Sequence, residues 1–264
     1  MMSDEAPQLL QYDMGDAVLA FSTMRMGVGV SQGAYASFNI NHYCGDDPQA
    51  VQTNRRLLCD AIGVSMGRLV IPHQTHGTVI RQIDEGFFTL SHPDRAKMLE
   101  GVDAVMTDMA DVCVGVSTAD CIPVLLYDED HHAVCAVHAG WRGTVARIVQ
   151  CAVKTMQTVY QSIPEQLKAV IGPGISINHF EVGDEVYQAF TEAGFDMDAI
   201  ARRFKKWHID LPLCNQMQLT ETGVPVEQIH QAGICTYDSY DRFFSARRLG
   251  IRSGRIFTGI AMKV

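Results

Sequence analysis

Four β-rich runs that lie close together between residues 102 and 140 constrain the fold more than any other feature. They are DAVMTD, VCVGVST, CIPVLLYD and AVCAVHAG, and short polar sequences typical of turns separate them. Residues 143–160 then change to helical spacing, with apolar residues at 145, 148, 149, 152, 153, 156, 159 and 160. Short, hairpin-like connections favour an α+β layered architecture over a strict alternation of parallel strands and helices.

The rest of the chain adds strands and helices on both sides of this block. Strands are predicted at 18–23 and 255–264, on either side of the PHQTHG segment within 68–83, and at the start of LKAVIGPGIS. Helices are predicted at 46–63, 181–194 and 210–223, with Asp210 as the N-cap of the last. Residues 26–47 are rich in Gly, Ser and Asn and are predicted to form a long loop. The sequence has no biased linker and no repeat, so we expect a single domain over 1–264.

Composition limits the class of protein and its partners. The net charge is −9 and no run of Lys or Arg occurs, which argues against nucleic acid as a partner. No apolar stretch approaches the length needed to cross a bilayer, and the acidic start MMSDEAPQLLQYD lacks the pattern of a secretory signal. We therefore expect a cytoplasmic protein without a membrane partner. Its oligomeric state stays open.

The eight cysteines are scattered and form no CxxC pair, so the sequence predicts neither a zinc ribbon nor a thioredoxin-like motif. In the expected compartment they should be reduced. Cys113, Cys135 and Cys151 lie within apolar runs and are predicted to be small buried hydrophobic residues.

Three residues could hold a metal ion. His76 stands in PHQTHG, Cys121 in TADCIPVLL and His138 in AVHAGWRGT, each beside glycine or turn-forming residues. If CIPVLLYD and AVCAVHAG pair as a hairpin, Cys121 lies near His138, because opposite residues of antiparallel strands are about 5 Å apart. Three nitrogen and sulfur ligands with a fourth position left for water are typical of a catalytic zinc ion. The pattern therefore predicts a zinc-dependent enzyme.

Two further residues near this group could act on a substrate. Gly143 is expected to precede a helix, so Arg142 and the free backbone N–H groups at that helix start could bind phosphate or a carboxylate. Arg142 could equally form an ordinary surface ion pair. Asp120 could transfer a proton or orient a ligand, or it could cap the turn before Cys121.

Other polar residues are expected to lie outside the metal group. His73 and His76 are separated by an odd number of positions in an extended segment, so their side chains should point to opposite faces and His73 should not be a ligand. His131 and His132 in DEDHH are predicted to form a solvated turn. Arg247 and Arg248 could contact an anion or be solvated, and the sequence leaves both interpretations open.

Several strings together carry a resemblance to a known family. SFNIN with CGDDPQAVQTNRR (37–56), HQTHG (73–77), TADCIPVLL (118–126), HAGWRGT (138–144), IGPGIS (171–176), FEVGDEV (180–186) and CTY (235–237) follow one another over nearly the whole chain. The chain resembles the YfiH-like proteins, which are described variously as polyphenol oxidases, laccase-domain proteins or purine nucleoside phosphorylases.

The resemblance implies a single domain with a layered α/β/β/α arrangement of mixed sheets, the YfiH/CNF-like fold. It implies a zinc ion held by His76, Cys121 and His138, with copper as the alternative metal. The implied activity is phosphorolysis of adenosine, inosine and methylthioadenosine, together with adenosine deamination at the same site. Purine nucleosides and phosphate are then the expected small-molecule partners. With Arg142, we count Asn39 and Arg55 from the matching strings as candidate substrate- or phosphate-binding residues.

Three other functions remain as alternatives. A copper polyphenol oxidase of the laccase type needs many histidine ligands, usually including His-X-His pairs, and this sequence has no such pair. A metal-independent cysteine hydrolase would use Cys121 as nucleophile and His138 as base, and an amidase that edits peptidoglycan precursors is implied by some relatives. A purely structural zinc ion in a binding protein is the non-catalytic alternative.

Overall fold

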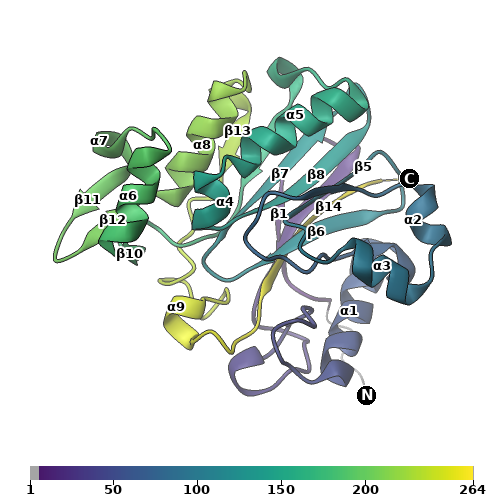
Figure 1. Ribbon diagram of the computed structural model, residues 1–264. Coiled ribbons are helices and arrows are strands. Elements are labelled where there is room, and N and C mark those ends of the chain that lie inside the picture. Colours follow the sequence, from purple (N-terminus) through teal and green to yellow (C-terminus); the bar gives the residue numbers. More distant parts are fainter. Residues whose placement is uncertain (1–5, 264) are drawn as a thin grey trace.

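The computed structural model describes residues 6–263, and two mixed β-sheets packed face to face form its centre (Figure 1). One sheet has the order β1-β2-β14-β6-β3 and consists of Leu9–Tyr12, Val18–Thr23, Ile256–Met262, Cys113–Thr118 and Leu69–Val70. The other has the order β13-β9-β7-β8-β5-β4 and consists of Ile229–Gln231, Lys168–Ile171, Ile122–Asp128, Ala133–Ala139, Ala104–Thr107 and Ile80–Gln82.

Strands β7 and β8 are apolar on both faces because both faces are covered. Val124 and Val137 pack with the helices on the outer side, whereas Leu125 and Ala136 pack against the five-stranded sheet. A strand that is buried on both faces reads as a continuous apolar run, which is the pattern in this part of the sequence. Strands β7 and β8 therefore lie at the centre of the molecule.

Helices complete the two outer layers. Helices α5 (Ile148–Tyr160) and α8 (Leu211–Glu221) cover the outer face of the six-stranded sheet, as Figure 1 shows. Helix α1 (Pro48–Ile62) packs Leu58 against Phe21 and Phe257 on the outer face of the five-stranded sheet. The layers therefore run α/β/β/α, and the predicted layered fold with mixed sheets is confirmed.

The remaining elements lie at the margins of these layers. A small sheet of β10 (Glu181–Val182), β12 (Trp207–Ile209) and β11 (Ala201–Arg203) carries α6 (Asp184–Glu192) and α7 (Met197–Ile200). Helices α2 (Glu85–Thr89) and α3 (His92–Met98) follow β4, α4 (Trp141–Val145) follows β8, and α9 (Ala246–Leu249) precedes β14. The helix predicted over 181–194 begins only at Asp184, with Gly183 as its N-cap, because Glu181–Val182 pair with β12 as a strand. Strands β11 and β12 and helices α2 and α3 have no counterpart in the prediction, since their apolar runs are too short to show a clear period.

Several predicted boundaries are confirmed by their capping residues. Helix α1 ends at Gly63, whose φ of 71° is left-handed, and Asp210 caps α8 by accepting a hydrogen bond from the Leu213 N–H. The hairpin of β7 and β8 and the strand at 18–23 are also confirmed. In the loop predicted over 26–47, Gly33–Tyr35 form a 3-10 turn and α1 begins at Pro48.

The prediction of one helix over 143–160 is wrong in two respects. The first helix begins at Trp141 with Gly140 as its N-cap, so Gly143 lies inside α4 rather than ahead of a helix. Arg147 then takes a left-handed φ of 61°, which separates α4 from α5. The Arg147 guanidinium lies 3.8 Å from the centre of the Phe195 ring and donates a hydrogen bond to the Ala193 carbonyl. These tertiary contacts hold a break that the apolar spacing does not reveal.

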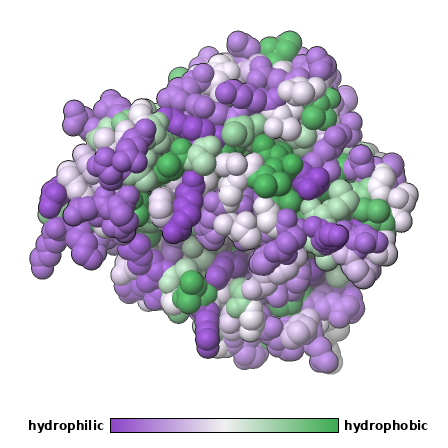
Figure 2. Space-filling view, in the orientation of Figure 1, coloured by the Kyte–Doolittle hydropathy of each residue, from purple (hydrophilic) through white to green (hydrophobic). Residues whose placement is uncertain are grey.

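The cysteines of the described residues are all free. Cys113 and Cys135 are fully buried, as predicted, but Cys151 on α5 is only half-buried, which corrects the prediction for that residue. The residues that the structure describes include no helix both long and apolar enough to span a bilayer. The face seen in Figure 2 is largely hydrophilic, with hydrophobic residues in small groups. The acidic N-terminal segment used above begins with residues 1–5, outside the described range.

Candidate metal centre and its cavity

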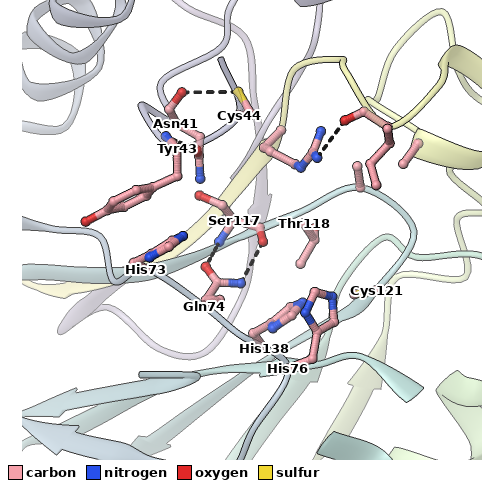
Figure 3. Close-up of a pocket in the computed structure, with 14 residues that line it drawn as sticks. Asn41, Tyr43, Cys44, His73, Gln74, His76, Ser117, Thr118, Cys121 and His138 are labelled. Carbon is pink, nitrogen blue, oxygen red and sulfur yellow. Dashed lines mark hydrogen bonds between the residues drawn. The ribbon is translucent and has the colours of Figure 1, made fainter. Parts of the chain in front are cut away.

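The structure brings His76, Cys121 and His138 together from three separate segments. His138 lies on β8 opposite Pro123 of β7, and Cys121 directly precedes β7. His76 comes from the loop between β3 and β4. One ligand atom from each residue lies within 4.8 Å of the others, and Figure 3 shows the two imidazoles and Cys121 at one end of a cavity.

Two backbone features allow this close approach. A Cβ atom at Gly140 would lie 2.8 Å from His76 Cδ2 and 3.2 Å from Cys121 Sγ, so only glycine fits at this position. His76 itself has a φ of 65°, a left-handed conformation that is uncommon for a side chain other than glycine. Such conformations persist where surrounding contacts hold them, and they cluster at functional sites.

Asp103 at the start of β5 supplies those contacts. Its Oδ1 accepts a hydrogen bond from the His76 N–H at 3.0 Å and from His138 Nδ1 at 2.7 Å, while its Oδ2 accepts from the Thr75 and Gly77 N–H groups at 3.2 and 2.7 Å. The carboxylate is fully buried. It fixes His138 with Nδ1 engaged, which leaves Nε2 for a metal, and this is the usual partner of a metal-binding histidine.

The charges within the group reinforce one another. Burial disfavours the Cys121 thiolate, but the charge of His138 and hydrogen bonds from His138 and His76 outweigh burial and lower the pKa of the thiol to about 6. Burial likewise opposes the charged form of His138, yet Cys121 and Asp103 raise the pKa of that imidazole. Burial also opposes the Asp103 carboxylate, but the hydrogen bond and charge of His138 together with the Gly77 and Thr75 N–H groups outweigh burial, so the pKa of Asp103 is lowered.

This donor set fits a zinc ion. A thiolate and two imidazoles are ligands that zinc prefers, and three protein ligands leave one position open. The thiol ionises readily, one imidazole is oriented by a buried carboxylate, and all three ligand atoms already converge. Closed structural zinc sites usually have four protein ligands, and no fourth residue of the described chain joins this group.

The cavity beside the group has a volume of about 250 Å³, and its lining contains basic residues but no acidic ones. Its walls hold three histidines and one arginine, and none of its lining residues is acidic. They are Asn41, Tyr43, Cys44, His73, Gln74, His76, Ser117, Thr118, Ala119, Cys121, His138, Ala246, Ile251 and Arg255. In a chain of net charge −9, a cavity without carboxylates is suited to an anionic ligand.

Two pairs of contacts give the cavity its walls. The Gln74 amide donates to the Ser117 carbonyl at 2.8 Å and accepts from the Ser117 N–H at 2.7 Å, which joins the His76 loop to β6 (Figure 3). The Tyr43 ring stacks on His73 with ring centres 4.2 Å apart. His73 Nδ1 lies 2.8 Å from the Glu100 carboxylate. His73 lines the cavity but does not belong to the metal group, as expected.

Arg255 is the cavity residue best placed to bind an anion. Its Nη1 donates to the Ser253 and Gly254 carbonyls and its Nη2 to the Ile251 carbonyl, so backbone oxygens hold the guanidinium without neutralising its charge. Among the described residues, no Asp or Glu forms an ion pair with it. The Nε–H and the second Nη2 proton form no hydrogen bond with the described residues, and a guanidinium presents such donors in a planar fork that matches two oxygens of a phosphate.

The three residues predicted to bind substrate or phosphate do not line this cavity. Arg142 is exposed and stacks on Trp141, with its guanidinium carbon 4.2 Å from the ring centre. Asn39 is fully buried, and its side chain bonds the Asn41 backbone, Asp46 and the Arg255 N–H. In this geometry both side chains contact protein partners rather than the cavity, and their role in binding substrate or phosphate stays a prediction.

Arg55, the third of these residues, donates from Nε to the Ile40 carbonyl and from Nη2 to His42. His42 in turn packs on Tyr43, with ring centres 3.7 Å apart. Burial and then the Arg55 charge lower the pKa of His42 to about 4, so that imidazole accepts the hydrogen bond in its neutral form. Arg55 therefore supports the cavity wall from behind.

Asp120 links the residue before Cys121 to the C-terminal part of the chain. Its carboxylate accepts hydrogen bonds from the Thr236 and Ser245 hydroxyls at 2.7 and 2.6 Å and from the Arg247 N–H at 2.6 Å. Asp120 also has a φ of 86°. A carboxylate with three protein donors, outside the cavity lining, is suited to positioning Cys121 rather than to transferring a proton.

The sequence interpretation missed Asp103 and Arg255. Asp103 did leave a signal, because an acid directly before the apolar run AVMT is buried and needs a partner. Arg255 left none, since it is more than a hundred residues from the metal group and reaches the cavity only through the pairing of β14 with β6. His131 and His132 are exposed in the β7–β8 turn, as predicted.

Comparison with known proteins shows what the whole chain is similar to. A family model described as "Multi-copper polyphenol oxidoreductase laccase" matches residues 19–263. A protein named purine nucleoside phosphorylase from Bacteroides thetaiotaomicron is 49% identical over 91% of this chain and 90% of its own length. A protein named adenosine deaminase RL5, from an unknown prokaryotic organism, is 42% identical over 94% and 95%. The crystal structure of a Bacillus licheniformis hypothetical protein YfiH superimposes with a TM-score of 0.91 at 28% identity, covering 98% of each chain.

Proposed function

The chain belongs to the family described as multi-copper polyphenol oxidoreductase laccase, and from this premise we propose that it is a zinc-dependent purine nucleoside phosphorylase. We propose adenosine, inosine and methylthioadenosine as substrates, with adenosine deamination as a second activity of the same site. The names of the similar proteins support this proposal over the oxidase activity in the family description. The absence of any His-X-His pair in the sequence points the same way.

The observation that carries the proposal is a single cavity that holds both a metal-binding group and a guanidinium with no carboxylate partner among the described residues. His76, Cys121 and His138 lie in the same walls as Arg255, and no acid lies there to repel phosphate. Phosphorolysis has a use for the guanidinium, because an anionic nucleophile must be held beside the sugar carbon that it attacks, and in this proposal the metal would polarise that nucleophile. A hydrolase acting only with water would not require the guanidinium.

Each residue then has a defined part. Bound to His76, Cys121 and His138, zinc would supply a Lewis acid that polarises an oxygen nucleophile. Arg255 holds phosphate through its planar fork. A phosphate oxygen forms the new bond to the ribose C1′ while the bond to the purine nitrogen breaks, and the departing purine takes up a proton. His73, which Glu100 orients, is the cavity imidazole outside the metal group, and we assign it that proton transfer.

Adenosine deamination is the second candidate, favoured by the similarity to the protein named adenosine deaminase RL5. In this reaction water attacks C6 of adenine and ammonia leaves. The same cavity serves both reactions if water takes the place of phosphate as nucleophile. Arg255 is then needed for phosphorolysis only, which separates the two activities experimentally.

The test is incubation of zinc-loaded protein with adenosine, with and without inorganic phosphate, followed by chromatographic separation of adenine, inosine and hypoxanthine. We expect adenine only with phosphate, and inosine in both conditions. No purine product in either condition, at full zinc occupancy, would refute the proposal and favour the peptidoglycan-precursor alternative. Turnover by metal-free protein whose Cys121 can be labelled covalently would favour the cysteine hydrolase.

A pair of arginine variants tests the assignment of the phosphate site. Arg255→Met removes the fork, so the KM for phosphate should rise at least 10-fold, the equivalent of about 1.4 kcal/mol, while deamination stays within a factor of two or so. Arg142→Met is the matched control and should leave both activities near the wild type. A large effect of Arg142→Met on the phosphate KM would contradict the assignment to Arg255 and would indicate that phosphate binds at the start of α4.

A further inference from the structure

A second group of metal-ligating side chains lies apart from the first. His179, Cys235 and Asp238 each offer one ligand atom, and these atoms lie within 4.8 Å of one another. His179 belongs to the loop that follows β9, and the other two belong to the segment that follows β13. The first group shares none of these residues, and the function proposed above makes no use of them.

The two segments are already fastened together by their backbones. The Gly174 N–H donates to the Ile234 carbonyl at 3.2 Å, and the Thr236 N–H donates to the Gly174 carbonyl at 3.0 Å. The Ser176 N–H points at Cys235 Sγ at 3.4 Å. The sulfur is therefore placed by the chain, half-buried, and does not depend on a mobile surface side chain.

The contact between His179 Nε2 and the Asp238 carboxylate, at 2.7 Å, could be an ordinary surface ion pair. Such a pair does not account for the third ligand atom or for the polar group beside it. Ser176 Oγ is buried without a hydrogen-bond partner among the described residues. It lines, together with Cys235, a cavity of about 200 Å³. Cys235 thus lies between this cavity, which holds the unpartnered hydroxyl, and the His179 imidazole and Asp238 carboxylate, which approach its sulfur from outside the cavity lining.

We propose that His179, Cys235 and Asp238 form a second metal site, which takes a thiophilic divalent cation, with zinc as the best match. Thiolate and imidazole select zinc over magnesium or calcium, and the thiolate and carboxylate together balance a charge of +2. Metal binding replaces the His179–Asp238 hydrogen bond and releases the thiol proton to solvent.

The second metal site would also affect the structure around the first metal site. Thr236, next to Cys235, donates its hydroxyl to Asp120, which directly precedes Cys121. A cation that clamps the loop after β9 to the segment after β13 would hold this hydrogen bond in place. The second site would therefore stabilise the support of the catalytic group without contacting substrate.

Zinc content per chain tests the proposal. After equilibrium dialysis against a small excess of zinc, we expect two zinc ions per wild-type chain, one for Cys121→Ser, one for Cys235→Ser and none for the double variant. Cys151→Ser removes a half-buried cysteine outside both groups, so it is the matched control and should retain two. Cobalt added to Cys121→Ser should give a thiolate-to-cobalt charge-transfer band that Cys235→Ser abolishes.

Two outcomes would overturn the second site. One is a Cys121→Ser protein that binds no zinc and shows no thiolate-to-cobalt band. The other is a double variant that still binds one ion with the affinity of Cys121→Ser. If Cys235→Ser does not fold, His179→Gln in the Cys121→Ser background takes its place, with the same expected loss of the last zinc ion. Since the readout is metal content, it is independent of whether nucleosides are the substrates.

Discussion

Replacing Asp103 by Asn tests how the candidate metal centre is held together. Each carboxylate oxygen accepts two hydrogen bonds, one oxygen from His76 and His138 and the other from Thr75 and Gly77. In either orientation the Asn side chain turns an NH₂ group towards two of these four N–H donors. Two hydrogen bonds to a charged group are then lost in a fully buried place. At about 1.5–3 kcal/mol for each, Asp103→Asn should destabilise the protein by about 3–6 kcal/mol.

Urea unfolding of the metal-free proteins measures this loss, and competition with a chelator measures zinc affinity. The affinity should fall about 10- to 100-fold, as it does when the partner of a metal-binding histidine is removed. Asp108→Asn is the control, because Asp108 is exposed just after the same strand, and its effect should stay within about 0.5 kcal/mol. Equal unfolding midpoints and equal zinc affinities for the two variants would refute the reasoning.

Three further predictions concern the same group. In metal-free protein the alkylation rate of Cys121 should rise as pH increases through about 6, because a lowered pKa makes the thiolate the main form above that pH. His138→Gln should move this midpoint upward, and an unchanged midpoint would exclude His138 as the cause. Gly140→Ala should weaken zinc binding at least 10-fold, since its Cβ would lie 2.8 Å from a ligand imidazole, whereas Gly67→Ala has open space and should bind zinc normally. Asp120→Asn should lower the melting temperature and kcat but leave the shape of the pH–rate profile intact, and loss of one limb of that profile would instead make Asp120 a proton-transfer group.

The stability of Asp103→Asn also depends on pH in a defined direction. The native state lowers the pKa of Asp103, so this carboxylate adds stability above its unfolded pKa and loses it as pH falls through the lower folded value. The stability difference between wild type and Asp103→Asn should therefore be complete at neutral pH and shrink in acid. The stability difference between wild type and Asp108→Asn should not change in this way with pH, because both proteins keep the Asp103 carboxylate.

Local sequence determined the parts of the site that lie on one hairpin. The polar turn DEDHH between two apolar runs fixes the register of β7 and β8, and this register alone places Cys121 near His138. Capping residues such as Asp210 and Gly63 likewise act within a few positions of themselves. These features were predictable because the interactions that decide them are short in sequence.

Only the tertiary structure decided which strand joined which sheet and what surrounded the metal group. Strands β5, β6 and β7 follow one another closely, yet β6 lies in one sheet and its two neighbours in the other. Their apolar runs look alike, because each is buried on both faces, and such a run carries no signal of its pairing partner. That pairing decides three features of the site: the position of His76 beside the other two ligands, the burial of Asp103 among N–H donors, and the position of Arg255 in the cavity wall. They depend on the packing of the whole domain, which no short stretch of sequence specifies.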